Sequence, residues 1–69
     1  MQPKEIFELV IKADERIKYA SANNAEQRRE QARELLLQAR AEAVAIGNDG
    51  LVAQAEQRLA DLERGPSEP

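Results

Sequence analysis

The amino-acid sequence predicts an all-α fold, an antiparallel three-helix bundle. Apolar residues recur at steps of three and four positions in three segments, as they do on one face of an α-helix. Short stretches of turn-forming residues separate these segments, and short connections make successive helices antiparallel neighbours. No strand signal competes, because threonine is absent and β-branched residues are few.

The first helix is expected from about Pro3 to Ala20. Proline suits the first helical position, where its missing N–H leaves no hydrogen bond unmade. Phe7 and Ile11 form a flanking stripe one step round the helix from the main apolar seam. That seam has the alternating spacing of helix-packing positions and consists of Ile6, Val10, Ala13, Ile17 and Ala20.

The central helix, from Asn23 to Ile46, is the longest predicted element. It contains no glycine or proline and is rich in good helix formers. Asn23 and Asn24 are both suitable N-caps, since each is followed three residues later by Glu or Gln, and Gly47 suits the C-terminal end. The main apolar face consists of Ala25, Ala32, Leu36, Ala39, Ala43 and Ile46.

The third helix is expected from about Gly50 to Glu63. Gly65 ends it, and the residues that follow include two prolines and no apolar side chain. We therefore expect one domain over residues 1–64 and a disordered C-terminal tail over residues 65–69. The apolar face of this helix consists of Leu51, Val52, Ala55, Leu59 and Leu62.

The composition argues against an enzyme. Histidine and cysteine are absent, which removes the usual general base, the thiol nucleophile and common metal ligands. The 13 acidic residues lie mostly at helix-surface positions among basic ones, and a thin three-helix domain has little room for a catalytic cleft. The turn at residues 48–50 lacks oxygen ligands at most later positions of a calcium loop. We expect no catalytic residue, no cofactor, no metal and no small-molecule substrate.

The charge pattern argues against membranes and nucleic acids as partners. The net charge is −3, and no apolar run approaches the ~20 residues of a membrane-spanning helix. Over residues 26–34 three arginines are balanced by three glutamates, and the only aromatic residues are Phe7 and Tyr19. No signal peptide is recognisable at the N-terminus, so a cytoplasmic location is the default expectation. The arginine cluster consists of Arg28, Arg29, Arg33 and Arg40.

Two residues of the central helix lie off its main apolar face. At about 100° per residue, Leu37 and Val44 fall nearly opposite Ala39 and Ala43. They are either scattered surface aliphatics, which folded proteins commonly expose, or a second surface for packing against a partner or another subunit. Association would also help a domain whose alanine-rich core is expected to be thin.

The segment 32–62 resembles the helix-turn-helix rhythm of tetratricopeptide repeats. Ala32, Leu36 and Ala39 match the small-large-small spacing of that family's second helix, and residues 43–48 match the turn between repeats. Glu56 and Glu63 depart from the family, because they stand where its first helix carries aromatic residues. The resemblance covers about half of the chain, which together with the first helix would amount to about one and a half repeats. It implies tetratricopeptide-like helix packing and a protein-binding groove, with no particular ligand.

The leading hypothesis is a small non-enzymatic protein-interaction module. It would lay an amphipathic helix, from another protein or from its own copy, against the exposed apolar residues. The alternatives are a homo-oligomeric structural protein that uses the same residues for self-association and, less favoured, an arginine-rich nucleic-acid-binding protein. The expected partner-binding residues are Phe7, Ile11, Leu37 and Val44, with Arg33 and Arg40 at the rim.

Overall fold

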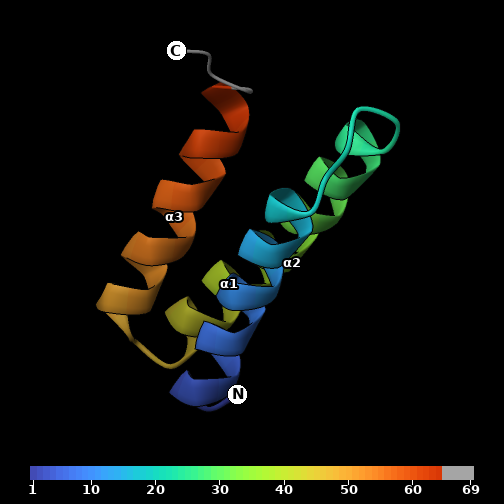
Figure 1. The fold of residues 1–69 in the computed structure, drawn as a ribbon. Coiled ribbons are helices and arrows are strands. Elements are labelled where there is room, and N and C mark those ends of the chain that lie inside the picture. The colour runs from blue at the N-terminus through green and yellow to red at the C-terminus, as the bar shows by residue number, and fades with distance from the viewer. Residues whose placement is uncertain (65–69) are drawn as a thin grey trace.

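The computed structural model describes residues 1–64, which form three α-helices packed against one another (Figure 1). Helix α1 spans Pro3–Lys18, α2 spans Ala25–Ala45 and α3 spans Asp49–Arg64. No strand occurs in this part of the chain, so the predicted all-α three-helix bundle is confirmed. The expected C-terminal tail, residues 65–69, lies outside the described residues.

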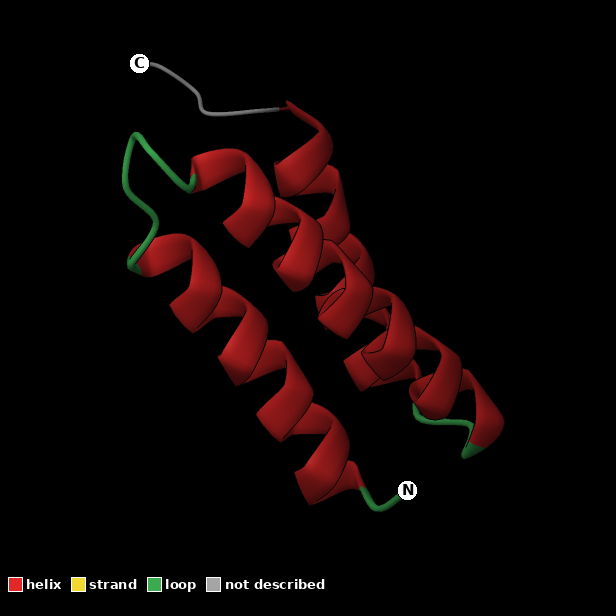
Figure 2. Ribbon diagram, turned by 90° about the vertical axis from the view of Figure 1, so that its right-hand side faces the viewer, coloured by secondary structure: helices red, strands yellow, loops and turns green. Residues whose placement is uncertain are grey.

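The first turn, between α1 and α2, is one of the green loops in Figure 2, and an asparagine side chain holds it. The Oδ1 atom of Asn24 accepts hydrogen bonds from the backbone N–H of Ser21 at 2.7 Å and from its hydroxyl at 3.1 Å. The turn begins earlier than predicted, because α1 ends at Lys18 and the N–H of Ala20 bonds back to the carbonyl of Ile17. Of the two N-caps that the sequence left open, Asn24 occupies the N-cap position, but its side chain makes no capping hydrogen bond to α2 and bonds back to Ser21.

The second turn, between α2 and α3, is a compact C-cap followed at once by an N-cap. The N–H of Gly47 donates to the carbonyl of Val44 at 3.0 Å, and the N–H of Asn48 donates to the carbonyl of Ala43 at 2.9 Å, the pair of bonds that defines a Schellman motif. Gly47 has a φ of 70°, which glycine adopts without a Cβ clash. The Oδ1 atom of Asn48 then accepts a bond from the N–H of Leu51 in the first turn of α3.

The core lies along α2, which packs against both other helices, whereas α1 and α3 touch each other at few positions. The largest fully buried side chains are Ile6, Val10 and Leu36. No polar or charged side chain is buried among residues 1–64. The remaining buried residues are small apart from one leucine, and they are Ala13, Ala32, Ala39, Ala43, Leu51 and Ala55.

Two residues expected on the core faces are exposed in the structure. Ile17 is 39% exposed, because it lies near the end of α1, where a cleft separates α1 from α3. Ile46 is 40% exposed, because it is the C-cap of α2 and lies just after the last helical residue. Periodicity alone assigned both to the core, since the spacing of a stripe does not reveal where the neighbouring helix ends. Within residues 1–64, every helix is too short or too polar to cross a lipid bilayer.

The buried and exposed leucines of α2 predict a sharp contrast in stability. Replacing Leu36 by alanine should lower the free energy of unfolding by about 2–5 kcal/mol, because its fully buried side chain would leave a cavity in a thin core. Replacing Leu37, which is 40% exposed, should cost less than about 1 kcal/mol. Urea unfolding followed by circular dichroism measures both, and equal losses would contradict the assignment of the core.

The two glycines of the second turn should respond oppositely to alanine. Gly47→Ala is expected to cost about 1 kcal/mol, because an L-residue is strained at a φ of 70° even though nothing lies within 4 Å of the added Cβ. Gly50 lies inside α3, where the added Cβ would sit 3.5 Å from Asn48 Oδ1, an ordinary contact. Gly50→Ala should therefore raise stability by up to about 1 kcal/mol. Thermal unfolding of both variants checks the sign, and destabilisation by Gly50→Ala would contradict this account.

Candidate interaction surfaces

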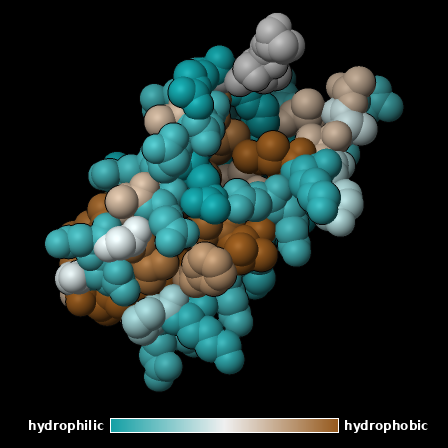
Figure 3. Space-filling view, turned by 60° about the vertical axis from the view of Figure 1, so that its left-hand side comes forward, coloured by the Kyte–Doolittle hydropathy of each residue, from teal (hydrophilic) through white to brown (hydrophobic). Residues whose placement is uncertain are grey.

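The four apolar residues predicted as partner contacts are all exposed. The exposed fraction is 43% for Phe7, 38% for Ile11, 40% for Leu37 and 62% for Val44. Figure 3 shows one face of the molecule, on which apolar patches are bordered by hydrophilic side chains. The four residues do not form one patch, because they lie on different helices and on different flanks of the bundle.

Phe7 and Ile11 lie on the flank of α1 that faces α3. They share a helical stripe with Asp14, at the three- and four-residue steps that align side chains on one face. Asp14 forms an ion pair with Arg58 of α3, which fixes the direction in which this stripe points. Phe7 and Ile11 therefore lie on the side of α1 from which Asp14 reaches α3.

Leu37 lies in a shallow groove between α2 and α3, which we call the α2–α3 groove. Its volume is about 250 Å³, and Leu37, Leu59 and Ala60 supply its apolar surface. The groove also contains Arg33 and Arg40 from α2 and Glu56 and Glu63 from α3. Val44 continues the α2 stripe one turn beyond Arg40. The structure thus brings both predicted rim arginines together with Leu37 in one site.

A second hollow extends this groove toward the end of α3. It has a volume of about 280 Å³ and shares Arg33, Leu59 and Glu63 with the first. The remaining lining residues are Glu26, Arg29, Glu30 and Leu62.

The two edges of the α2–α3 groove carry opposite charges. Because α2 and α3 run antiparallel from the turn at residues 46–48, Arg33 lies level with Glu63 and Arg40 lies level with Glu56. Among residues 1–64, none of these four side chains takes part in an ion pair. Their charges therefore face solvent and are available to a partner.

Sequence reasoning missed the two glutamates as parts of this site. Both are surface positions on a helix full of acidic and amide residues, so nothing in α3 alone marks them. A signal was present in the spacing, since Glu56 and Glu63 are seven residues apart, as Arg33 and Arg40 are. That spacing acquires meaning only once the two helices are known to be antiparallel neighbours.

A larger cleft opens at the far end of the bundle, and we call it the end cleft. Its volume is about 620 Å³, and its apolar walls are Ile17, Ala20, Ala25 and Leu62. Sequence reasoning did not predict this cleft, because it had assigned Ile17 and Ala20 to a closed core. The charged residues at its edges are Asp14, Lys18, Arg29, Arg58 and Asp61.

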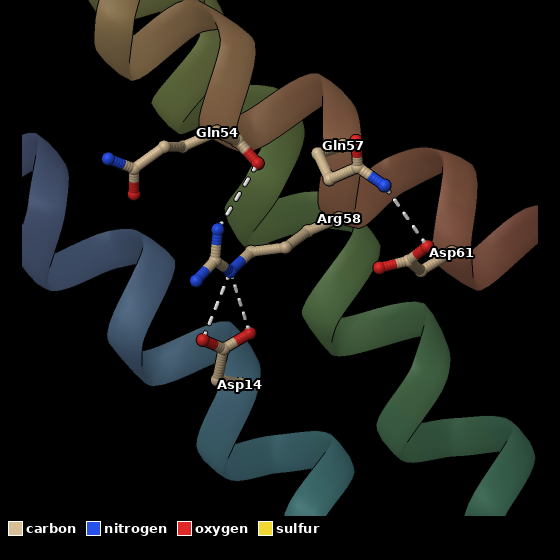
Figure 4. A network of polar contacts seen from close by, with 5 residues as sticks. All are labelled: Asp14, Gln54, Gln57, Arg58 and Asp61. Atoms are coloured by element: carbon tan, nitrogen blue, oxygen red, sulfur yellow. Dashed lines mark hydrogen bonds and ion pairs between the residues drawn. The ribbon is translucent and has the colours of Figure 1, made fainter.

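Polar contacts across the end cleft tie the three helices together. Arg58 Nε of α3 lies 3.0 Å from both carboxylate oxygens of Asp14 in α1 (Figure 4). Arg29 of α2 donates to the carbonyl oxygen of Leu62 at 2.6 Å, and so supplies a donor to the last turn of α3, where helix carbonyls lack internal partners. Asp61 is paired within α3, with Arg64. Most charges around the end cleft are therefore already used.

Arg28 belongs to a small basic patch that contains none of the other arginines of α2. It is a hollow of about 350 Å³ lined by Lys12, Arg16 and Arg28, with Tyr19 and one acid, Glu15. Arg33 and Arg40 lie instead in the α2–α3 groove, and Arg29 contacts Leu62. The arginine cluster of the sequence is thus divided between this patch and the α2–α3 groove with its extension, where Arg29 lies with Arg33.

No group of three or more acidic side chains among residues 1–64 is placed to hold a metal ion.

The ion pair across the end cleft should contribute little to stability. Asp14 and Arg58 have side chains that are 44% and 31% exposed, so solvent screens their attraction. A double-mutant cycle with Asp14→Asn and Arg58→Met should give a coupling free energy of about 0.2–1 kcal/mol, which shrinks at high salt. Glu8→Gln serves as a control, since Glu8 is exposed and makes no ion pair within residues 1–64. A coupling that is large and independent of salt would contradict this expectation.

Comparisons with protein-family models, with curated proteins and with solved structures find no match to this chain. The geometry of the surfaces is therefore the basis for any functional conclusion.

Proposed function

We propose that this protein is a small non-enzymatic interaction module that binds an amphipathic helix in the α2–α3 groove. The observation that carries the proposal is the arrangement of that groove, in which apolar side chains lie between a row of arginines and a row of glutamates, with no ion pair to either row inside the described chain. An amphipathic helix has the matching pattern of an apolar stripe with polar flanks.

The contacts follow from the geometry of the groove. Leu37 and Leu59 would pack against the apolar stripe of the bound helix, and Val44 would extend that contact toward the second turn. Arg33 and Arg40 would pair with acids on one flank of the bound helix. Phe7 and Ile11 belong, on this proposal, to a separate contact surface along α1.

The end cleft is the larger hollow but the poorer site for a helix. It lies at one end of the bundle, where residues of all three helices line it. Its charged neighbours are largely paired with one another or with backbone, as Arg58 is with Asp14 and Arg29 with Leu62. A partner that binds in the end cleft would have to break these contacts, whereas a partner in the α2–α3 groove would not have to break any ion pair among residues 1–64.

The tetratricopeptide-like rhythm of residues 32–62 supports the same class of function. Proteins of that kind present grooves between helices to other proteins, and the hairpin of α2 and α3 includes the matching residues Ala32, Leu36 and Ala39. A nucleic-acid partner is the less favoured alternative. Its best support is the patch of Lys12, Arg16 and Arg28, which is short and belongs to a chain of net charge −3. We retain the cytoplasm as the proposed location.

The proposal is tested with a synthetic helical peptide as the probe. The peptide carries leucines on one face, with glutamates along one flank and lysines along the other. In a titration of ¹⁵N-labelled protein, we expect shift changes at Leu37, Val44 and Leu59, because the peptide would lie in the groove. A peptide of the same composition in scrambled order, which has no apolar stripe, should not bind.

Two matched variants locate the binding surface. Leu37→Glu should weaken peptide binding at least about tenfold, because it places a charge on the apolar floor of the groove. Phe7→Glu should leave binding unchanged, although Phe7 is exposed to a similar degree, because it lies on another flank. Both variants should remain folded, as circular dichroism can confirm. Equal binding by the wild type and Leu37→Glu would contradict the proposed site.

A further inference from the structure

The charged edges of the α2–α3 groove have a property that the proposed function does not require. The row of arginines on α2 and the row of glutamates on α3 have the same seven-residue spacing, and they lie at matching levels along the groove. The groove therefore has a row of positive charges on one edge and a matching row of negative charges on the other edge. Such a surface can recognise a copy of itself, provided that the copy is turned so that one row meets the other.

We propose that the occupant of the α2–α3 groove is a second copy of this chain, related to the first by a two-fold axis parallel to α2. This proposal rests on the proposed function, since it names the helix that the groove binds. The axis places α2 of each copy over α3 of the other. Leu37 of one copy then meets Leu59 of the second copy, and the small Ala60 allows the helices to approach closely.

The charges decide between the two symmetric ways of joining these faces. With the axis parallel to α2, Arg33 faces Glu63 of the second copy and Arg40 faces Glu56, and both pairs occur twice. With the axis perpendicular to the helices, α2 lies over α2, so Arg33 faces Arg40 of the second copy and the glutamates face one another. Facing like charges destabilises an interface, so the parallel axis is the one that the charges select.

The acidic residues at the other end of α2 do not disturb this pattern. Glu26 and Glu30 line the same hollow as Glu63, but they precede Arg33, which is level with Glu63, by about two helical turns and one helical turn, respectively. They are therefore displaced along the axis from the acidic row of the second copy.

The size of the molecule predicts a weak, concentration-dependent dimer. The principal extents are 36 × 19 × 14 Å, so even the broad face falls short of the ~800 Å² that each partner buries in a standard interface. The dimer would place a four-helix core, made from two copies of α2 and α3, beside a monomer core that is mostly alanine. We expect dissociation constants on the order of micromolar or weaker.

Charge reversal tests the pairing directly. The variant R33E/R40E makes both edges of the groove acidic, and E56R/E63R makes both edges basic. Each alone should raise the dimer dissociation constant at least about tenfold, as measured by sedimentation equilibrium. An equal mixture of the two variants should form a heterodimer, and R33E/R40E/E56R/E63R should dimerise as the wild type does. All four positions are exposed, so the variants should fold, and circular dichroism verifies that they do.

Cysteine cross-linking distinguishes the two axes, and the natural chain contains no cysteine to interfere. A mixture of R40C and E56C chains should cross-link, because these positions face each other across the parallel axis. A mixture of R33C and R40C chains should not cross-link efficiently, because each of these positions would face an acid, whereas across the perpendicular axis they would face each other. The opposite result would overturn the proposed axis.

The outcomes separate this inference from the proposed function. A wild-type chain that is monomeric at all concentrations, or reversals that leave association unchanged, would overturn the second-copy proposal. If the synthetic helical peptide still binds at Leu37 in that case, the groove remains a helix-binding site whose partner is another chain. If the peptide also fails to bind, both proposals fall.

Discussion

Close contact along one face of α2 is the interaction on which the whole structure depends. Three of its four buried residues are alanines, and they allow α1 and α3 to approach α2 closely enough for Leu36 to be fully covered. Alanine contributes little buried area of its own, since its side chain is a single methyl group. The bundle thus obtains tight packing from small residues and hydrophobic burial from a few large ones, Ile6, Val10 and Leu36.

This small core leaves several apolar side chains outside it. With α2 in the middle and few contacts between α1 and α3, each outer helix covers only one flank of the central helix. Leu37 and Val44 on α2, and Phe7 and Ile11 on α1, remain partly or largely exposed as a result. An arrangement of three helices with one in the middle therefore produces grooves as a by-product of its packing, and the charged residues beside a groove determine what it can recognise.

The sequence predicted the elements well and their surroundings poorly, and the reasons are physical. A stripe of apolar residues reveals a helix and its inward face, which is why three helices and most of the core were predicted correctly. It does not reveal how far a neighbour extends, so Ile17 and Ile46 were assigned to the core although both are exposed. Glu56 and Glu63, which line the groove opposite Arg33 and Arg40, come from another helix, so their place in the site becomes visible only when the helices are placed side by side.

The absence of buried polar side chains among residues 1–64 has a consequence for how the helices keep their alignment. A buried hydrogen bond would fix one helix against the next, whereas a surface of alanines is smooth and fits a neighbour almost equally well after a shift of one turn. The alignment of this bundle is therefore specified by its turns, together with the side-chain contacts between helices at the end cleft. Asn24 with Ser21 and Gly47 with Asn48 set the lengths of the two connections, and so determine which turn of each helix lies beside which. The two turns thus help to fix an alignment of the helices that the alanine-rich core does not specify.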